Sequence, residues 1–340
     1  MHLPLFTVLL LTVQAHPALD SASVARVLTQ LKERFNRLCA RRSGAHQLRR
    51  LLGWAYADPG MPMPRPMPTP MPMPGGGGGG GVHVAFHGKS SDMDPATLRA
   101  FRGFIRDENR CVRSIAARVL GRRGGSGVYD LFLSLLRDAR SDLRETGALG
   151  LGELEDSRAI GPLSDALAGD AEPAVRMTAA WALGEIEEKV AIDALGRALR
   201  DRSPEVRRTA AWALGQIEDV RGVRPLGETE DGSGVAPAAA GLRDADPEVR
   251  VMAAWALGEI EDARGVTPLV AALKDGDIDV RATAAWALGE IESPLAREGL
   301  TAAQDDESGA VRRAATWALR QLDDDDDPRV RVRPRIKIKS

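Results

Sequence analysis

The sequence predicts an all-α fold, a solenoid of about seven stacked helix pairs, and three observations lead to this prediction. A Val-Arg or Leu-Arg dipeptide recurs seven times, beginning at residues 112, 143, 175, 206, 249, 280 and 311. Five of the six intervals are 31 or 32 residues long, and self-similarity at such a period marks a solenoid. Helix-start signals recur in the same register, and one unit is too short to bury its apolar face without its neighbours.

Each unit is expected to form two helices joined by a turn. In the best-formed copy the first helix is expected over Ala263–Lys274, where Pro268 is tolerated because it falls near the first turn. A turn at Asp275-Gly276-Asp277 follows. The cleanest second helices start at Ser203-Pro204-Glu205 and Asp246-Pro247-Glu248, which supply an N-cap, a proline at the first helical position and an acid in the first turn.

The second helix of each unit has one apolar face. Advancing about 100° per residue from Val206 places four apolar residues within about 80° of it, and we expect this face to form the core. The four residues are Ala210, Ala213, Leu214 and Ile217. Ala211 and Gly215 lie to one side and are small enough to let a neighbouring helix approach closely.

Two second-helix segments share one long phrase: Val206–Asp219 (VRRTAAWALGQIED) and Val249–Asp262 (VRVMAAWALGEIED). They resemble the HEAT-repeat family, in particular the short HEAT-like repeats of phycobilisome-lyase-type proteins. The resemblance covers about residues 95–322 and implies a right-handed α-solenoid whose second helices line a concave surface that holds partners. The first two units match less well and Arg320 replaces the final repeat glycine, as expected of capping repeats.

Changes in composition divide the chain outside the repeats into separate segments. Residues 1–15 carry an apolar run and a Val13-x-Ala15 site typical of a signal peptide, with a buried N-terminal helix as the alternative. Residues 20–57 predict a small helical hairpin, and residues 58–94 a disordered linker of Met-Pro repeats and seven glycines. The repeats occupy 95–322, and an acidic run with a basic tail occupies 323–340. The chain is therefore exported, periplasmic or extracellular, if the signal is real, and otherwise cytoplasmic.

Five of the six tryptophans occupy one register of the second helices. Trp212 falls about 240° from Val206, nearly opposite the core face, and the same offset holds in four other units. These tryptophans are Trp181, Trp212, Trp255, Trp286 and Trp317, and one turn later follow Glu185, Gln216, Glu259, Glu290 and Gln321. We expect the rings to project from the concave face as an exposed stripe, which usually marks an interaction site. The alternative is that the rings pack sideways and stiffen the solenoid; the two are compatible.

Charge indicates what such a groove would bind. Residues 95–327 hold 30 basic and 43 acidic side chains, so the groove is expected to be aromatic and acidic. It suits an extended partner segment with Arg, Lys or Pro. The tail from Pro328 to Ser340 alternates six cations with apolar residues and could fold back into its own or a neighbour's groove. A soluble tail that touches anionic surfaces nonspecifically is the alternative.

Several function classes are excluded. No apolar run reaches the roughly 18 residues of a membrane span, and Cys39 and Cys111 make neither a disulfide framework nor a zinc finger. The Met-Pro tract could in principle bind Cu(I), but we predict no metal and no cofactor. No metalloprotease, Walker or nucleophile-elbow motif occurs. All five histidines precede the repeats, against a deoxyhypusine-hydroxylase-like iron site, and Cys111 is expected to be a small buried residue.

The sequence therefore predicts a non-catalytic scaffold for protein–protein interaction that binds a partner segment on a Trp- and Glu-lined concave face. The family resemblance leaves one alternative, a bilin lyase or chaperone of the phycobilisome-lyase type. No specific nucleic-acid partner is expected.

Overall fold

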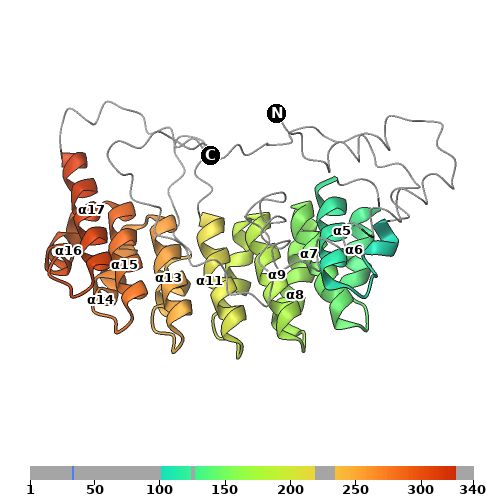
Figure 1. The fold of residues 1–340 in the computed structure, drawn as a ribbon. Helices are drawn as coiled ribbons and strands as arrows, with labels where there is room; N and C mark the ends of the chain where they lie inside the picture. The colour runs from blue at the N-terminus through green and yellow to red at the C-terminus, as the bar shows by residue number, and fades with distance from the viewer. Residues whose placement is uncertain (1–32, 34–100, 124–126, 219–233, 327–340) are drawn as a thin grey trace. The chain divides into compact units, whose positions relative to one another are not determined.

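The structure is a computed structural model that describes residue 33 and residues 101–123, 127–218 and 234–326. These residues confirm the all-α prediction, because they form α-helices and short 3-10 helices and include no strand (Figure 1). The predicted signal peptide, hairpin (apart from Glu33), linker and basic tail lie outside the described residues, as does Cys39.

Helices alternate between the two roles that the repeats predict. The first helices are α6 (Val128–Leu136), α8 (Ile160–Gly169), α10 (Ile192–Ala198), α12 (Val235–Gly241), α14 (Val266–Ala272) and α16 (Arg297–Ala303). The second helices are α5 (Arg110–Arg123), α7 (Ser141–Leu154), α9 (Pro173–Ile186), α11 (Pro204–Glu218), α13 (Pro247–Ile260), α15 (Ile278–Ile291) and α17 (Gly309–Asp326). The 3-10 turns η1 (Ser157–Ala159), η2 (Lys189–Ala191), η3 (Ala263–Gly265) and η4 (Pro294–Ala296) precede α8, α10, α14 and α16.

Helix boundaries follow the local signals. Asp246 caps α13 by accepting the N–H of Glu248, and Pro247 occupies the first helical position, as expected. The helix expected over Ala263–Lys274 is shorter than predicted, since η3 takes its first three residues and α14 ends at Ala272. Pro268 is the third residue of α14, where its missing N–H interrupts no helical hydrogen bond.

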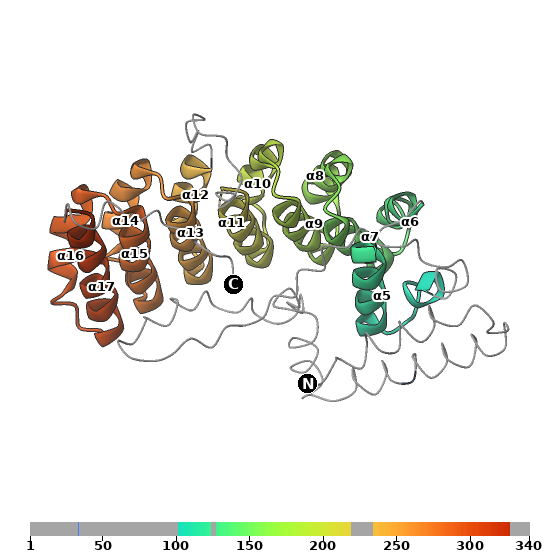
Figure 2. The same ribbon diagram turned by 90° about the horizontal axis from the view of Figure 1, so that it is seen from above.

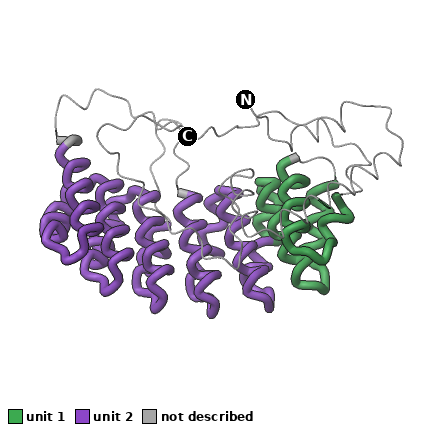
Figure 3. Tube along the Cα trace, viewed as in Figure 1, with its two compact units in different colours: residues 1–63, 89–162 green, residues 64–88, 163–340 purple. Residues whose placement is uncertain are grey.

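The chain divides into two compact units (Figure 3). Unit 1 comprises residues 1–63 and 89–162, and its described part holds α5, α6 and α7, with α5 and α6 both packed on α7. Unit 2 comprises residues 64–88 and 163–340 and holds α9 to α17. No described helix is both long enough and apolar enough to cross a membrane.

Unit 2 is a stack in which each second helix packs on the next, in the order α9, α11, α13, α15, α17. Figure 2 shows these second helices in one row on the inner side of a gentle curve and α10, α12, α14 and α16 in an outer row. The predicted core face of α11 is confirmed, because Val206, Ala210, Ala213 and Leu214 are all fully buried and Ile217 is 1% exposed. We call the surface of the second-helix row that faces away from the first helices the inner face.

In four of the five Val-Arg dipeptides of unit 2, the arginine ties neighbouring repeats together. Its guanidinium binds an aspartate carboxylate in the turn of the next repeat through two nitrogens, with Nε to Oδ2 distances of 2.7 or 2.8 Å. It also donates to backbone carbonyls of its own turn, as Arg176 does to the carbonyl of Asp170 at 2.8 Å. The pairs, here called the Arg–Asp ladder, are Arg176–Asp201, Arg207–Asp244, Arg250–Asp275 and Arg281–Asp306.

The one irregular interval does not interrupt the ladder. Arg207 and Asp244 are 37 residues apart and the other partners 25, so this pair spans twelve extra residues with the same contact. These residues fall between the end of α11 and the start of α12. The repeat geometry is therefore independent of this connection.

Candidate functional site

The tryptophans lie where the sequence places them but are not the exposed stripe that it predicts. Trp181, Trp212, Trp255 and Trp317 are half-buried, and Trp286 is only 7% exposed. The expectation of freely projecting rings is therefore wrong, and the sideways packing that was the alternative is what the structure has. Four of the five tryptophans nevertheless keep part of their apolar surface exposed.

Each of four rings packs on a glycine of the preceding second helix. A Cβ atom at Gly215 would lie 2.7 Å from Cζ3 of Trp255 and 3.0 Å from the Cα atom of Ala256. Gly184, Gly258 and Gly289 meet the rings of Trp212, Trp286 and Trp317 in the same way. The predicted close approach at Gly215 is confirmed, and its partner is the next tryptophan.

The acidic and amide residues one turn after each tryptophan form a second row on the inner face, here called the glutamate row although two of its five members are glutamines. Glu185, Gln216, Glu259, Glu290 and Gln321 are all half-buried. Two residues further, α9, α13 and α15 end on glutamates in the left-handed region, with φ of 55° at Glu187, 49° at Glu261 and 55° at Glu292. Glycine is the usual residue at such a C-cap, and acids are unfavourable at the negative end of a helix dipole. The C-terminal ends of these helices therefore carry pairs of glutamates at some cost in stability.

In unit 1, the glutamate equivalent to Glu185 binds arginine side chains. In the repeat alignment Arg118 and Arg122 of α5 occupy the tryptophan position and the position one turn later, and Glu153 of α7 aligns with Glu185. Arg118 and Arg122 both bind the Glu153 carboxylate, the latter with Nε 2.7 Å from Oε2. Arg118 is 4% and Glu153 9% exposed. This cluster was not predicted from the sequence, although Arg118, Arg122 and Glu153 occupy repeat positions that the Val-Arg spacing identifies.

Charge on the inner face of unit 2 is mixed. Arg208 of α11 lies one turn before Trp212 and is ion-paired with Glu248 at the start of α13. The groove is therefore not the uniformly acidic one that composition led us to expect. Its carboxylates include those of the glutamate row, near the C-terminal ends of the second helices.

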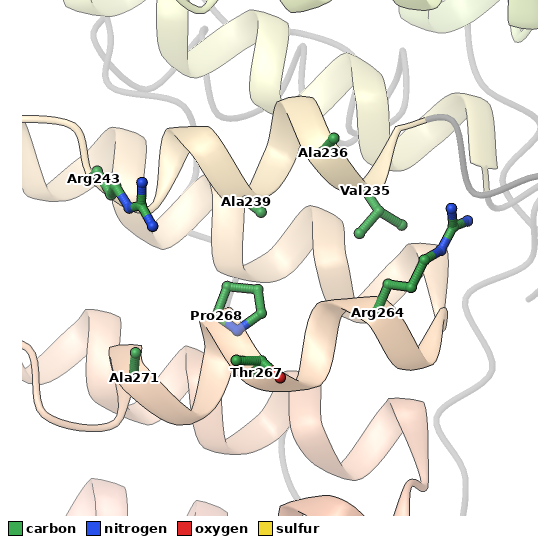
Figure 4. A pocket seen from close by; sticks show the side chains of 8 residues that line it. All are labelled: Val235, Ala236, Ala239, Arg243, Arg264, Thr267, Pro268 and Ala271. Atoms are coloured by element: carbon green, nitrogen blue, oxygen red, sulfur yellow. The ribbon is translucent and has the colours of Figure 1, made fainter.

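A separate groove lies between the first helices α12 and α14 (Figure 4). Its volume is about 700 Å³, and its lining is mostly apolar. Small residues such as Ala236, Ala239 and Pro268 line it, with Arg243 and Arg264 beside them, and Arg264 is held by Asp262 at 2.8 Å. None of its lining residues is an acid, a histidine or a cysteine.

The described residues hold no cluster of three or more His, Cys, Asp or Glu side chains able to bind a metal ion. Cys111 is half-buried and disulfide-bonded. It is thus neither the fully buried small residue that was expected nor a free thiol nucleophile.

The model for HEAT repeats matches residues 98–171, 160–240 and 235–320, most of the chain and nearly all of the predicted repeats. The chain belongs to the HEAT-repeat family. Proteins of this architecture stack repeats into extended concave surfaces that bind other proteins. No curated protein matches the sequence.

Several solved structures resemble this HEAT-repeat chain. Human deoxyhypusine hydroxylase in complex with glycerol is 24% identical, with 67% of this chain and 96% of that one covered and a TM-score of 0.33. The CpcE–CpcF complex of phycocyanin lyase from Nostoc sp. PCC7120 is 20% identical, with coverages of 71% and 98% and a TM-score of 0.41. The Escherichia coli protein YibA is 20% identical, with coverages of 66% and 92% and a TM-score of 0.46. Such identities show the shared fold alone.

Proposed function

We propose that this HEAT-repeat chain is a non-catalytic scaffold that binds an extended segment of a partner protein across the inner face of unit 2. The observation that carries the proposal is the continuity of two rows on adjacent helices. Tryptophan recurs at one register on all five second helices from α9 to α17, half-buried on four of them, and the position one turn later holds Glu on α9, α13 and α15 and Gln on α11 and α17. Ring edges suit apolar or proline side chains, and glutamates suit Arg or Lys, so the partner segment is basic or Pro-rich.

The glutamates, rather than the tryptophans, are the residues with which to test this proposal. A Trp→Ala change would open a cavity against the neighbouring glycine and would weaken folding together with binding. Glu185→Gln, Glu259→Gln and Glu290→Gln keep the side-chain shape and remove three charges. Asp165→Asn, Asp193→Asn and Glu298→Gln, on the first helices α8, α10 and α16, make a control of equal charge change on exposed residues.

The wild type, the inner-face triple variant and the control triple variant would each be used in affinity purification, and their affinities for the purified partner would then be measured. We expect a partner held by the wild type and the control to be lost from the inner-face triple variant, with the helical circular dichroism of all three alike. A partner retained equally by both triple variants would contradict a binding role for the inner face. None of the contacts described above favours the bilin-lyase alternative, which absorbance of the protein after incubation with a bilin would test.

We also propose that the chain is exported. The apolar run ending at Val13 and the disulfide of Cys111 support this, because disulfides persist mainly in oxidising compartments. Determination of the mature N-terminus from the native source tests it. A chain retaining Met1 would contradict cleavage of a signal peptide.

A further inference from the structure

The basic tail is opposite in charge to the glutamates of the glutamate row, and it begins just after α17, the last helix of that row. The last described residue, Asp326, ends α17, which is the last member of the inner row. The residues that follow include Arg329, Arg331, Arg333, Arg335, Lys337 and Lys339, with no acid after Asp327. A strongly cationic segment therefore leaves the structure at one end of a row that holds three glutamates and two glutamines.

The tail is long enough to cross that row. Fourteen residues follow Asp326, and an extended chain of that length reaches about 45 Å. Packed helices lie about 8–10 Å apart, so the four intervals from α17 to α9 span about 32–40 Å. In an extended segment alternate side chains point to one side, which would put every cation of the tail on the same face.

Unit 1 contains an ion pair of the kind expected between the tail and the glutamate row. Glu153, at the position equivalent to Glu185, Glu259 and Glu290, binds two guanidinium groups from the neighbouring helix. On the preceding second helix, the position of Arg118 is taken by Trp212 for Glu259 and by Trp255 for Glu290. An arginine-rich segment laid across the row would present guanidinium groups to glutamates of the same register.

We propose that residues 328–340 bind the inner face of their own unit 2 and compete there with the partner segment. The tail is thus an autoinhibitory arm, and this inference rests on the proposed binding function of the same face. Tethering makes the competition effective, because short flexible linkers give effective concentrations in the millimolar range.

Fluorescence anisotropy of a fluorescein-labelled peptide of residues 328–340 tests the proposal. The peptide is titrated with the full chain and with a full-length variant in which the six tail cations are replaced by Gln. We expect the variant to bind the peptide at least tenfold more tightly than the wild type, since its own tail no longer occupies the face. Equal binding of the peptide by the two chains would overturn the proposal.

Two controls separate the site from general charge attraction. In the neutral-tail chain, Glu185→Gln, Glu259→Gln and Glu290→Gln should weaken peptide binding at least fivefold, whereas Asp165→Asn, Asp193→Asn and Glu298→Gln should leave it within twofold. A peptide of the same composition with its alternation broken should bind at least fivefold more weakly. If both triple variants weaken binding equally, or both peptides bind equally, the inference is wrong.

The outcomes also separate this inference from the proposed function. If the inner-face variant loses a protein partner while the tail peptide binds neither chain, the scaffold proposal survives and the autoinhibitory arm does not. If the mass of the wild type in analytical ultracentrifugation rises with concentration while that of the neutral-tail chain does not, the tail binds a second copy, and docking on its own unit is overturned.

Discussion

At the scale of single residues, the contact between a glycine and the next tryptophan sets how closely second helices approach. A Cβ atom added at Gly215 or Gly258 would lie within 3.0 Å of an indole ring and of a backbone atom of the following second helix. Because backbone atoms cannot move aside as a flexible side chain can, this spacing depends on the absence of a side chain.

Gly258→Ala is therefore expected to destabilise unit 2, although alanine is the better helix former. The new methyl group would lie 2.8 Å from Cζ3 of Trp286 and 3.0 Å from the Cα atom of Ala287. Overpacking of this kind costs about 1–3 kcal/mol. Urea unfolding followed by circular dichroism measures it. Gly276→Ala, in the turn before α15 with nothing within 4 Å, is the control and should change the free energy of unfolding by less than about 0.5 kcal/mol.

The glutamates with positive φ at the helix C-termini predict a substitution that raises stability. Glu261→Gly should stabilise the protein by about 1 kcal/mol, because glycine adopts the observed φ of 49° without strain and removes a negative charge from a helix C-terminus. Glu261→Ala removes the charge but keeps the strain and should gain less. Thermal unfolding of both variants measures the difference. A gain for Ala equal to that for Gly would show that charge alone is responsible.

At the scale of elements, the Arg–Asp ladder joins each turn to the next. Arg250→Met keeps most of the side-chain volume but leaves the half-buried Asp275 carboxylate without its guanidinium, so we expect a loss of about 3 kcal/mol in the free energy of unfolding. A double-mutant cycle with Asp275→Asn should give a strong coupling energy. Arg297→Met breaks the Arg297–Asp323 pair, whose side chains are 43% and 63% exposed, and should cost no more than about 1 kcal/mol.

The ladder also predicts loss of stability in acid. Burial alone would raise the pKa of Asp275, but hydrogen bonds from Arg250 and from the N–H of Asp277 outweigh it and lower that pKa. The pKa of Asp306 is lowered chiefly by its hydrogen bonds from Arg281. A lowered folded-state pKa stabilises the fold above the unfolded pKa of about 3.9, and this contribution is lost as the pH falls through the folded value.

Urea unfolding at a series of pH values from 7 to 3 measures this effect. We expect the free energy of unfolding of the wild type to fall on acidification, and Asp275→Asn to reduce the size of the fall. Parallel pH profiles for the two proteins would contradict a titrating role for Asp275.

Much of this was predictable at the same scale. The period, the core face of α11 and the N-cap at Asp246 follow from local spacing, which a sequence contains directly. The exposure of the tryptophans did not follow, because a helical wheel gives a direction relative to one helix and ignores the neighbour that covers it. The Arg–Asp ladder was not predicted either, because Arg250 and Asp275 belong to different repeats and meet only when the repeats stack.

At the scale of the whole molecule, the disulfide of Cys111 predicts how many free thiols the intact chain has. Because Cys111 is disulfide-bonded, native protein denatured without reductant should show no free thiol in an Ellman titration, and two per chain after reduction. Cys111→Ser should expose one free thiol. Two thiols in protein isolated without reductant would contradict the bond and would remove one support for export.

The uninterrupted ladder across Arg207 and Asp244 has a consequence for engineering. Since a pair separated by 37 residues makes the same contact as pairs separated by 25, the stack accommodates twelve extra residues between Arg207 and Asp244 with this contact unchanged. Doubling a flexible loop costs only about 0.6 kcal/mol of closure entropy. A fluorescent reporter or an epitope could therefore be spliced in between α11 and α12 while the repeats on either side keep their register.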